Sequence, residues 1–212
     1  MGERWLPYAA AALATGASAL IMGALSLPSS PSVLELVSTE EASPERWLLA
    51  SAAFMYAAFA LTLGIPTFIH LLKGRGRVTG QVGAVVFAFG TIGTAGYAAL
   101  LILFRALAVH SVADTQEFDL LSRDTGLIVY LGSFLLAFQA GLLVLGVALL
   151  MAGTVARWIP VVMIGHAVTS PIEHRLPEGM QDAFSVLLGV ALIAVAVSAN
   201  ESWSGVMRRA PR

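Results

Sequence analysis

The fold class follows first from residues 126–151, which read GLIVYLGSFLLAFQAGLLVLGVALLM. This stretch contains no charged residue, and Gln139 is its most polar side chain. A helix needs about 20 consecutive apolar residues to cross the hydrocarbon core of a bilayer. Residues 126–151 are therefore predicted to form a transmembrane helix.

The composition of the whole chain agrees with this prediction. Of its 212 residues, 58% are hydrophobic and 12% are charged, and the mean hydropathy is +0.82. A soluble domain has about 45–50% apolar and roughly 25% charged residues. A soluble fold of this length could not bury so much apolar surface, so the chain is predicted to be an integral membrane protein.

Five further apolar segments flank residues 126–151. Together they predict an all-α, polytopic bundle of six transmembrane helices that forms a single integral membrane domain over residues 1–212. The expected spans are about residues 5–27, 47–72, 82–104, 126–151, 158–172 and 183–199. The first apolar run, of 23 residues, exceeds the 7–15 of a signal peptide, so we expect it to be retained.

The fifth span is the shortest. Only 13 residues, Trp158–Ser170, precede Pro171, which ends or kinks a helix. Ile172 could extend the helix, and a re-entrant half-helix is the alternative. We favour a full span because of the charges around it.

Charges alternate in sign between successive connections. Eight of the twelve basic residues fall on one side of the predicted bundle: Arg4, Lys73, Arg75, Arg77, Arg157, Arg208, Arg209 and Arg212. Eleven of the thirteen acidic residues fall within or beside the loops 28–46, 111–125 and 171–182. Because positive charge marks the cytoplasmic side, both termini are predicted to be cytoplasmic, in the inner (cytoplasmic) membrane of the cell.

Several functions are not supported by the sequence. The absence of cysteine excludes disulfides, thiolate catalysis and cysteine-ligated metal sites. Four scattered histidines do not indicate a metal site, and no cofactor is expected. The chain has no nucleotide-binding or hydrolase motif and no basic patch for nucleic acid. The partners that remain are the lipid bilayer, a lipophilic small molecule, and a second copy or another membrane protein.

Side chains near the ends and along the faces of the spans add detail. Trp47 is expected in an aromatic belt at the membrane surface. Gly83, Gly90, Gly93 and Gly96 follow one another along the third span, where small residues let helix backbones approach closely. These features predict a compact bundle.

Polar side chains near mid-depth are candidates for a functional site, because they are costly in a bilayer. Tyr97, Gln139 and His166 lie near the middle of the third, fourth and fifth spans and could converge. Tyr97 and Gln139 are candidate substrate contacts, and His166 is a candidate catalytic group. The alternative is hydrogen bonding between helices, worth about 0.6 kcal/mol per bond on average.

A second group of candidates lies at the outer mouth of the bundle. Glu173 and Asp182 flank the loop after the fifth span, and either could deliver a proton if an apolar setting raises its pKa. Arg105, His110 and His174 could bind or orient a substrate there. The alternative is that these are solvated loop charges, with Arg105 reaching the headgroups.

Pro171, Ile172 and Glu173 resemble the Pro-x-Glu element of small membrane-embedded carotenoid and terpene cyclases. The resemblance covers three residues. It implies a helical bundle of similar size in which Glu173 starts cyclisation by protonating an isoprenoid. In this chain His174, Arg175 and Leu176 follow, in place of the aromatic run usual in lycopene cyclases.

Two classes of function follow. The first is a membrane enzyme that acts on an isoprenoid or terpene-like substrate by acid-initiated chemistry, as a cyclase or isomerase. The second is a non-enzymatic transport, immunity or accessory subunit of the membrane.

Overall fold

The computed structural model describes residues 5–27, 44–72, 74–110, 120, 123–173 and 177–209. Within these ranges the chain forms six α-helices and one 3-10 turn, with no strand. The helices are α1 (Leu6–Ser26), α3 (Pro44–Leu71), α4 (Arg77–Val109), α6 (Thr125–Ala152), α7 (Trp158–Glu173) and α8 (Glu178–Arg209), and the turn is η2 (Gly74–Gly76). The predicted all-α helical membrane bundle is confirmed.

Five of the helices are long and apolar enough to cross a membrane. The sixth, α7, has 16 residues and is about 24 Å long, against about 30 Å for a hydrocarbon core. It is thus the short helix that the sequence predicts. The number of crossings and the orientation in the membrane stay predictions.

Three helices extend beyond the apolar segments that mark them in the sequence. α4 begins at Arg77 and continues to Val109, and α8 runs from Glu178 to Arg209. α7 continues through Pro171 and ends two residues later. An apolar stretch of sequence predicts only the part of a helix that fits the hydrocarbon core of a bilayer. The helix itself can continue at either end through polar residues.

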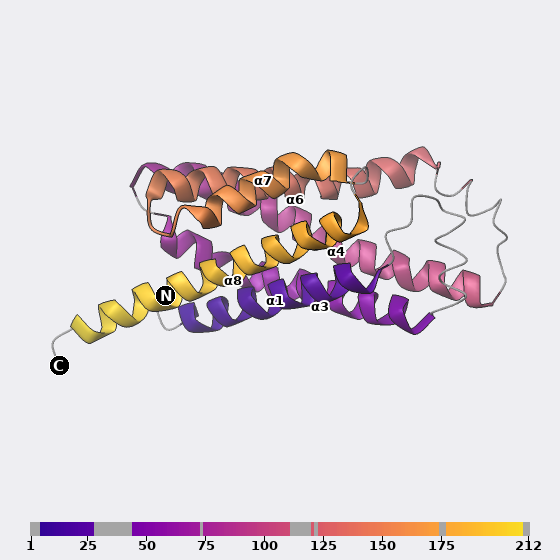
Figure 1. The fold of residues 1–212 in the computed structure, drawn as a ribbon, viewed down its shortest axis with the longest axis horizontal. Coiled ribbons are helices and arrows are strands. Elements are labelled where there is room, and N and C mark those ends of the chain that lie inside the picture. Colours follow the sequence, from indigo (N-terminus) through magenta and orange to yellow (C-terminus); the bar gives the residue numbers. More distant parts are fainter. Residues whose placement is uncertain are drawn as a thin grey trace.

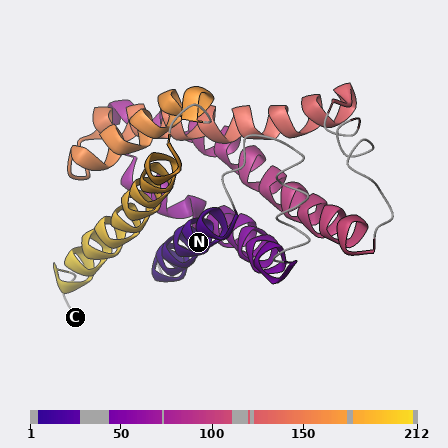
Figure 2. The ribbon, with the colours of Figure 1, turned by 45° about the vertical axis from the view of Figure 1, so that its right-hand side comes forward.

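The helices form a closed ring in the order of the sequence (Figures 1 and 2). α1 packs against α3, α3 against α4, α4 against α6, α6 against α7, α7 against α8, and α8 returns to α1. Neighbours in the ring are antiparallel. The ring therefore has an interior that all six helices can line.

The two ends of the bundle differ (Figure 1). Both termini, η2 and the turn from α6 to α7 lie at one end, and α3, α4 and α6 reach furthest at the other. The last residues of α7 and the first residues of α8 stop short of that second end. Basic Arg77 and Arg157 lie at the first end, and Arg123 and Asp124 lie at the second.

Close helix contacts build the core. An added Cβ at Gly16 would lie 2.9 Å from the backbone nitrogen of Leu61, so α1 and α3 touch through their backbones. Gly141 of α6 meets Phe87 of α4 in the same way, with 2.5 Å from an added Cβ to the Phe87 Cα. Small residues thus bring the helices together, as the sequence predicts.

The prediction that Trp47 lies in an aromatic belt at the membrane surface is wrong. Its side chain is 1% exposed and belongs to a buried cluster with Phe54, Ala98 and Leu101, so it does not face the membrane surface. α4 packs over α3 at this level and covers the indole. Trp5 and Trp158, by contrast, are 55% and 47% exposed.

Candidate functional site

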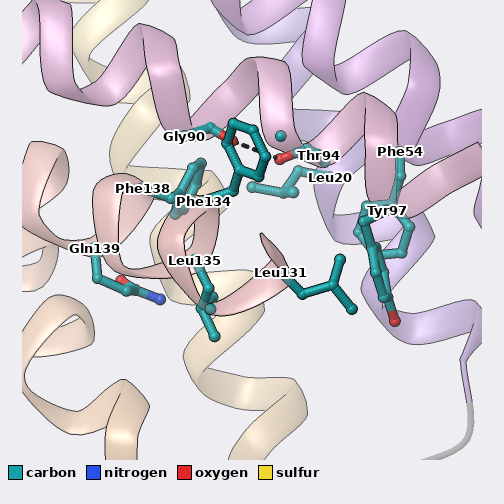
Figure 3. A pocket seen from close by; sticks show the side chains of 12 residues that line it. Leu20, Phe54, Gly90, Thr94, Tyr97, Leu131, Phe134, Leu135, Phe138 and Gln139 are labelled. Atoms are coloured by element: carbon teal, nitrogen blue, oxygen red, sulfur yellow. Dashed lines mark hydrogen bonds between the residues drawn. The ribbon is translucent and has the colours of Figure 1, made fainter. Parts of the chain in front are cut away.

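A cavity of about 470 Å³ lies between α4 and α6, in the half of the bundle away from the termini (Figure 3). Leu20 of α1 and Phe54 of α3 contribute to its wall. The remaining described lining residues are Gly90, Gly93, Thr94 and Tyr97 of α4 and Leu131, Gly132, Phe134, Leu135, Phe138 and Gln139 of α6. No described residue of α7 or α8 lines the cavity.

Glycines of α4 and aromatic side chains of α6 shape the wall. The space for a Cβ at Gly90 is taken by the backbone of Phe138, and that at Gly93 by the ring of Phe134. The Phe138 ring also packs on Phe87, with 5.1 Å between ring centroids. Phe134 and Phe138 can therefore occupy these positions because Gly93 and Gly90, which face them, have no side chains.

The cavity has a polar residue at each end (Figure 3). The Tyr97 ring stands edge-on to Phe54, with 5.7 Å between ring centroids. At the other end, the Gln139 Nε2 donates to the Ser170 hydroxyl of α7 over 2.8 Å. The second polar atom of this carboxamide, Oε1, is buried and has no hydrogen-bond partner. Because Oε1 is covered by protein atoms, it does not face the open space of the cavity, and leaving such an acceptor unpaired costs about 1–3 kcal/mol.

The short α7 explains why the cavity is open at one side. Ser170 is three residues from the end of α7 and lies level with Gln139. Leu135 and Leu131 are one and two turns further along the same face of α6, beyond the reach of α7. Leu135 is 57% exposed, and no residue from 125 to 137 is buried. The cavity therefore opens through the surface of the bundle beside the N-terminal half of α6.

The structure brings together two of the three mid-depth residues that the sequence singles out. Tyr97 and Gln139 line the same cavity. His166 does not line it, although it is buried at 8% exposed and its Nδ1 has no partner. Its helix, α7, packs against α6 and α8 below the level of the opening.

The candidates at the outer mouth are more scattered. The Arg105 Nε donates to the Pro44 carbonyl over 2.8 Å and so ties the end of α4 to the start of α3. His110 is exposed in the turn after α4, and Asp182 is half-buried near the start of α8. None of these three lines the cavity.

Two outer candidates can be placed only in part. Glu173 is the last residue of α7, but its side chain lies outside the described residues, as does all of His174. Glu173 is seven residues beyond His166, on the same face and about 10 Å further along the helix. The two residues therefore lie at different levels along α7.

Sequence reasoning missed the aromatic wall of the cavity. Phe134 and Phe138 are four residues apart, which places them on one face of α6, and Gly90 and Gly93 are three apart on α4. This spacing is a usable signal for two helices with interlocking faces. It does not reveal which two helices meet.

The chemistry of the cavity follows from its lining. Leucine, phenylalanine and glycine dominate, and no charged side chain is present among the described lining residues. Within the described ranges, no group of three His, Asp or Glu side chains could hold a metal ion. Asp124 lines a second, shallower hollow, where its carboxylate accepts from the Leu127 N–H and caps α6. The cavity thus suits an apolar molecule with few polar atoms.

Comparison of the chain with known protein families, with curated proteins and with solved structures finds no match.

Proposed function

We propose that this protein binds a lipophilic molecule in the cavity between α4 and α6. The observation that carries the proposal is a cavity of about 470 Å³ between α4 and α6 with an apolar, largely aromatic lining. Its volume lies in the range of about 300–1,000 Å³ that is usual for small-molecule sites. An apolar lining with a few fixed polar groups is also typical of such sites.

The side opening supports uptake from the bilayer. Leu135 lines the cavity and is 57% exposed, and a Cβ added at the neighbouring Gly132 would meet nothing within 4 Å. A lipophilic molecule concentrates in the hydrocarbon of the membrane, next to this opening. It would therefore enter between helices without passing through water.

Acid-initiated chemistry on an isoprenoid is a finer form of the same proposal. Glu173 lies three residues beyond Ser170 on α7, about 4.5 Å further in the direction in which the cavity extends from Gln139. Glu173 or Asp182 would be the acid, and His166 would tune it. Binding without turnover would instead make the protein a non-enzymatic subunit, and conversion of an isoprenoid panel by wild type but not by Glu173→Gln distinguishes the two.

Binding is tested by filling the cavity. Gly132→Phe places a ring in open space at the cavity wall, and Gly165→Phe is a matched control on α7, where an added Cβ also meets nothing within 4 Å. Native mass spectrometry of the purified proteins should show a bound lipophile in wild type and Gly165→Phe and a loss of most of it in Gly132→Phe. Equal amounts of bound lipophile in both variants would contradict the proposal.

A further inference from the structure

The sequence distributes charge unevenly between the two ends of the bundle. Eight basic residues and two acidic residues, Glu3 and Glu201, lie in or beside the terminal segments, the link that contains η2 and the turn before α7. The remaining four basic and eleven acidic residues belong to the segments of the other end. The end with the termini therefore has an excess of six positive charges, and the other end has an excess of seven negative charges.

Two arginines of the basic end lie beside the C-terminal end of α6. An added Cβ at Gly76 would collide with the Ala148 carbonyl oxygen, so η2 packs on the last turns of α6, and Arg77 follows directly. Gly153 ends α6 with a φ of 62°, and Arg157 comes four residues later, just before α7. The starts of α4 and α7 thus bring Arg77 and Arg157 to the same end of α6.

Both guanidinium groups are available to a ligand. Arg77 and Arg157 are exposed, and within the described ranges neither side chain makes a hydrogen bond or an ion pair. Glu201, the acid of this end that the structure describes, is exposed on α8 and pairs with neither arginine. At the other end, by contrast, the Arg105 side chain is bound to the Pro44 carbonyl.

Exposed aromatic side chains place this end at the surface of a bilayer. Trp158 directly follows Arg157 and is 47% exposed. At the start of α1, Trp5 and Tyr8 are also exposed, with 6.1 Å between their ring centroids. Tryptophan and tyrosine rings in membrane proteins concentrate at the level of the lipid headgroups. The arginines at this end are therefore at the level of lipid phosphates.

From the charge excess, the free guanidinium groups and the aromatic level, we infer that Arg77 and Arg157 form a binding surface for the phosphate groups of anionic phospholipids. Guanidinium binds phosphate through two parallel hydrogen bonds. A zwitterionic phospholipid carries the same phosphate, but its own cationic group cancels the charge. The surface is separate from the cavity between α4 and α6, so this inference does not rest on the proposed function.

The test compares phosphatidylglycerol with phosphatidylcholine of the same acyl chains. The full-length protein in detergent is titrated with each lipid, and bound lipid is counted by native mass spectrometry. Wild type should prefer phosphatidylglycerol, and Arg77→Gln and Arg157→Gln should each lower this preference about fivefold. That is the factor for about 1 kcal/mol per basic residue near an anionic surface. Both variants should bind phosphatidylcholine as wild type does, which also reports that they fold.

Two control variants locate the surface. Arg46→Gln removes an exposed arginine from the first turn of α3, at the other end of the bundle, and should keep the preference. Gly132→Phe fills the cavity and should also keep it. Inorganic phosphate added at the concentration of the lipid should leave the preference unchanged, because it lacks the acyl chains that hold a phospholipid beside the helices.

Each contrary outcome overturns the inference for a different reason. Equal binding of both lipids by wild type would show that charge does not select the lipid. An unchanged preference in Arg77→Gln and Arg157→Gln, or an equal loss in Arg46→Gln, would show that these two arginines do not form the surface. Loss in Gly132→Phe would place the phospholipid in the cavity, and displacement by inorganic phosphate would assign the arginines to a soluble anion.

Discussion

Single glycines decide how closely α4 and α6 approach. Gly141 is buried where α6 crosses Phe87 of α4, and an added Cβ would lie 2.5 Å from both the nitrogen and the Cα of Phe87. Backbone atoms cannot move aside as the tip of a flexible side chain can. The contact therefore holds the two helices at a fixed separation just below the cavity.

Gly141→Ala is expected to lower the free energy of unfolding by about 1–3 kcal/mol, because a methyl group must be forced into a packed backbone contact. Gly165→Ala is the matched control, since its Cβ enters open space, and it should leave stability unchanged or raise it by up to about 1 kcal/mol. Thermal unfolding of the purified proteins measures both. Equal melting temperatures for the two variants would argue against this packing.

Among the elements, α7 has the largest effect on the site. Its 16 residues bring Ser170 to Gln139 and then end, so α7 does not cover the N-terminal half of α6. A longer α7 would fill the opening. A helix of this length can still cross a bilayer that thins locally around it.

Whether α7 crosses can be tested with single cysteines, because the native chain has none. Ala156→Cys lies just before α7, Gly179→Cys lies in the first turn of α8, Thr125→Cys starts α6, and all three positions are exposed. If α7 spans, a membrane-impermeant maleimide should label Ala156→Cys from one side and the other two from the opposite side. Labelling of Ala156→Cys and Gly179→Cys from the same side would make α7 re-entrant.

For the whole molecule, the position of a residue along its helix was predictable from the sequence, and the rotation of the helix about its axis was not. The apolar segments predict all six helices, because apolar content along a segment determines whether it inserts. The same logic places Tyr97 and Gln139 near mid-depth, and both line the cavity.

The partners of these side chains depend on which faces meet. α6 is apolar on every side, so its sequence does not mark the face that packs against α4 or α7. The bond from Gln139 to Ser170 and the burial of Trp47 both result from helix rotation. Neither the hydrogen bond nor the burial could be predicted without knowing which helix faces pack together.

The most direct test of the central claim, a lipophile bound between α4 and α6, is photolabelling. A farnesol analogue with a diazirine in its chain would be cross-linked to the full-length protein and the labelled peptides mapped by mass spectrometry. The account predicts labels concentrated on residues 90–97 and 131–139 and removed by excess farnesol or by Gly132→Phe. Labels spread evenly over the exposed outer faces of the helices, and unaffected by either competitor or variant, would contradict it.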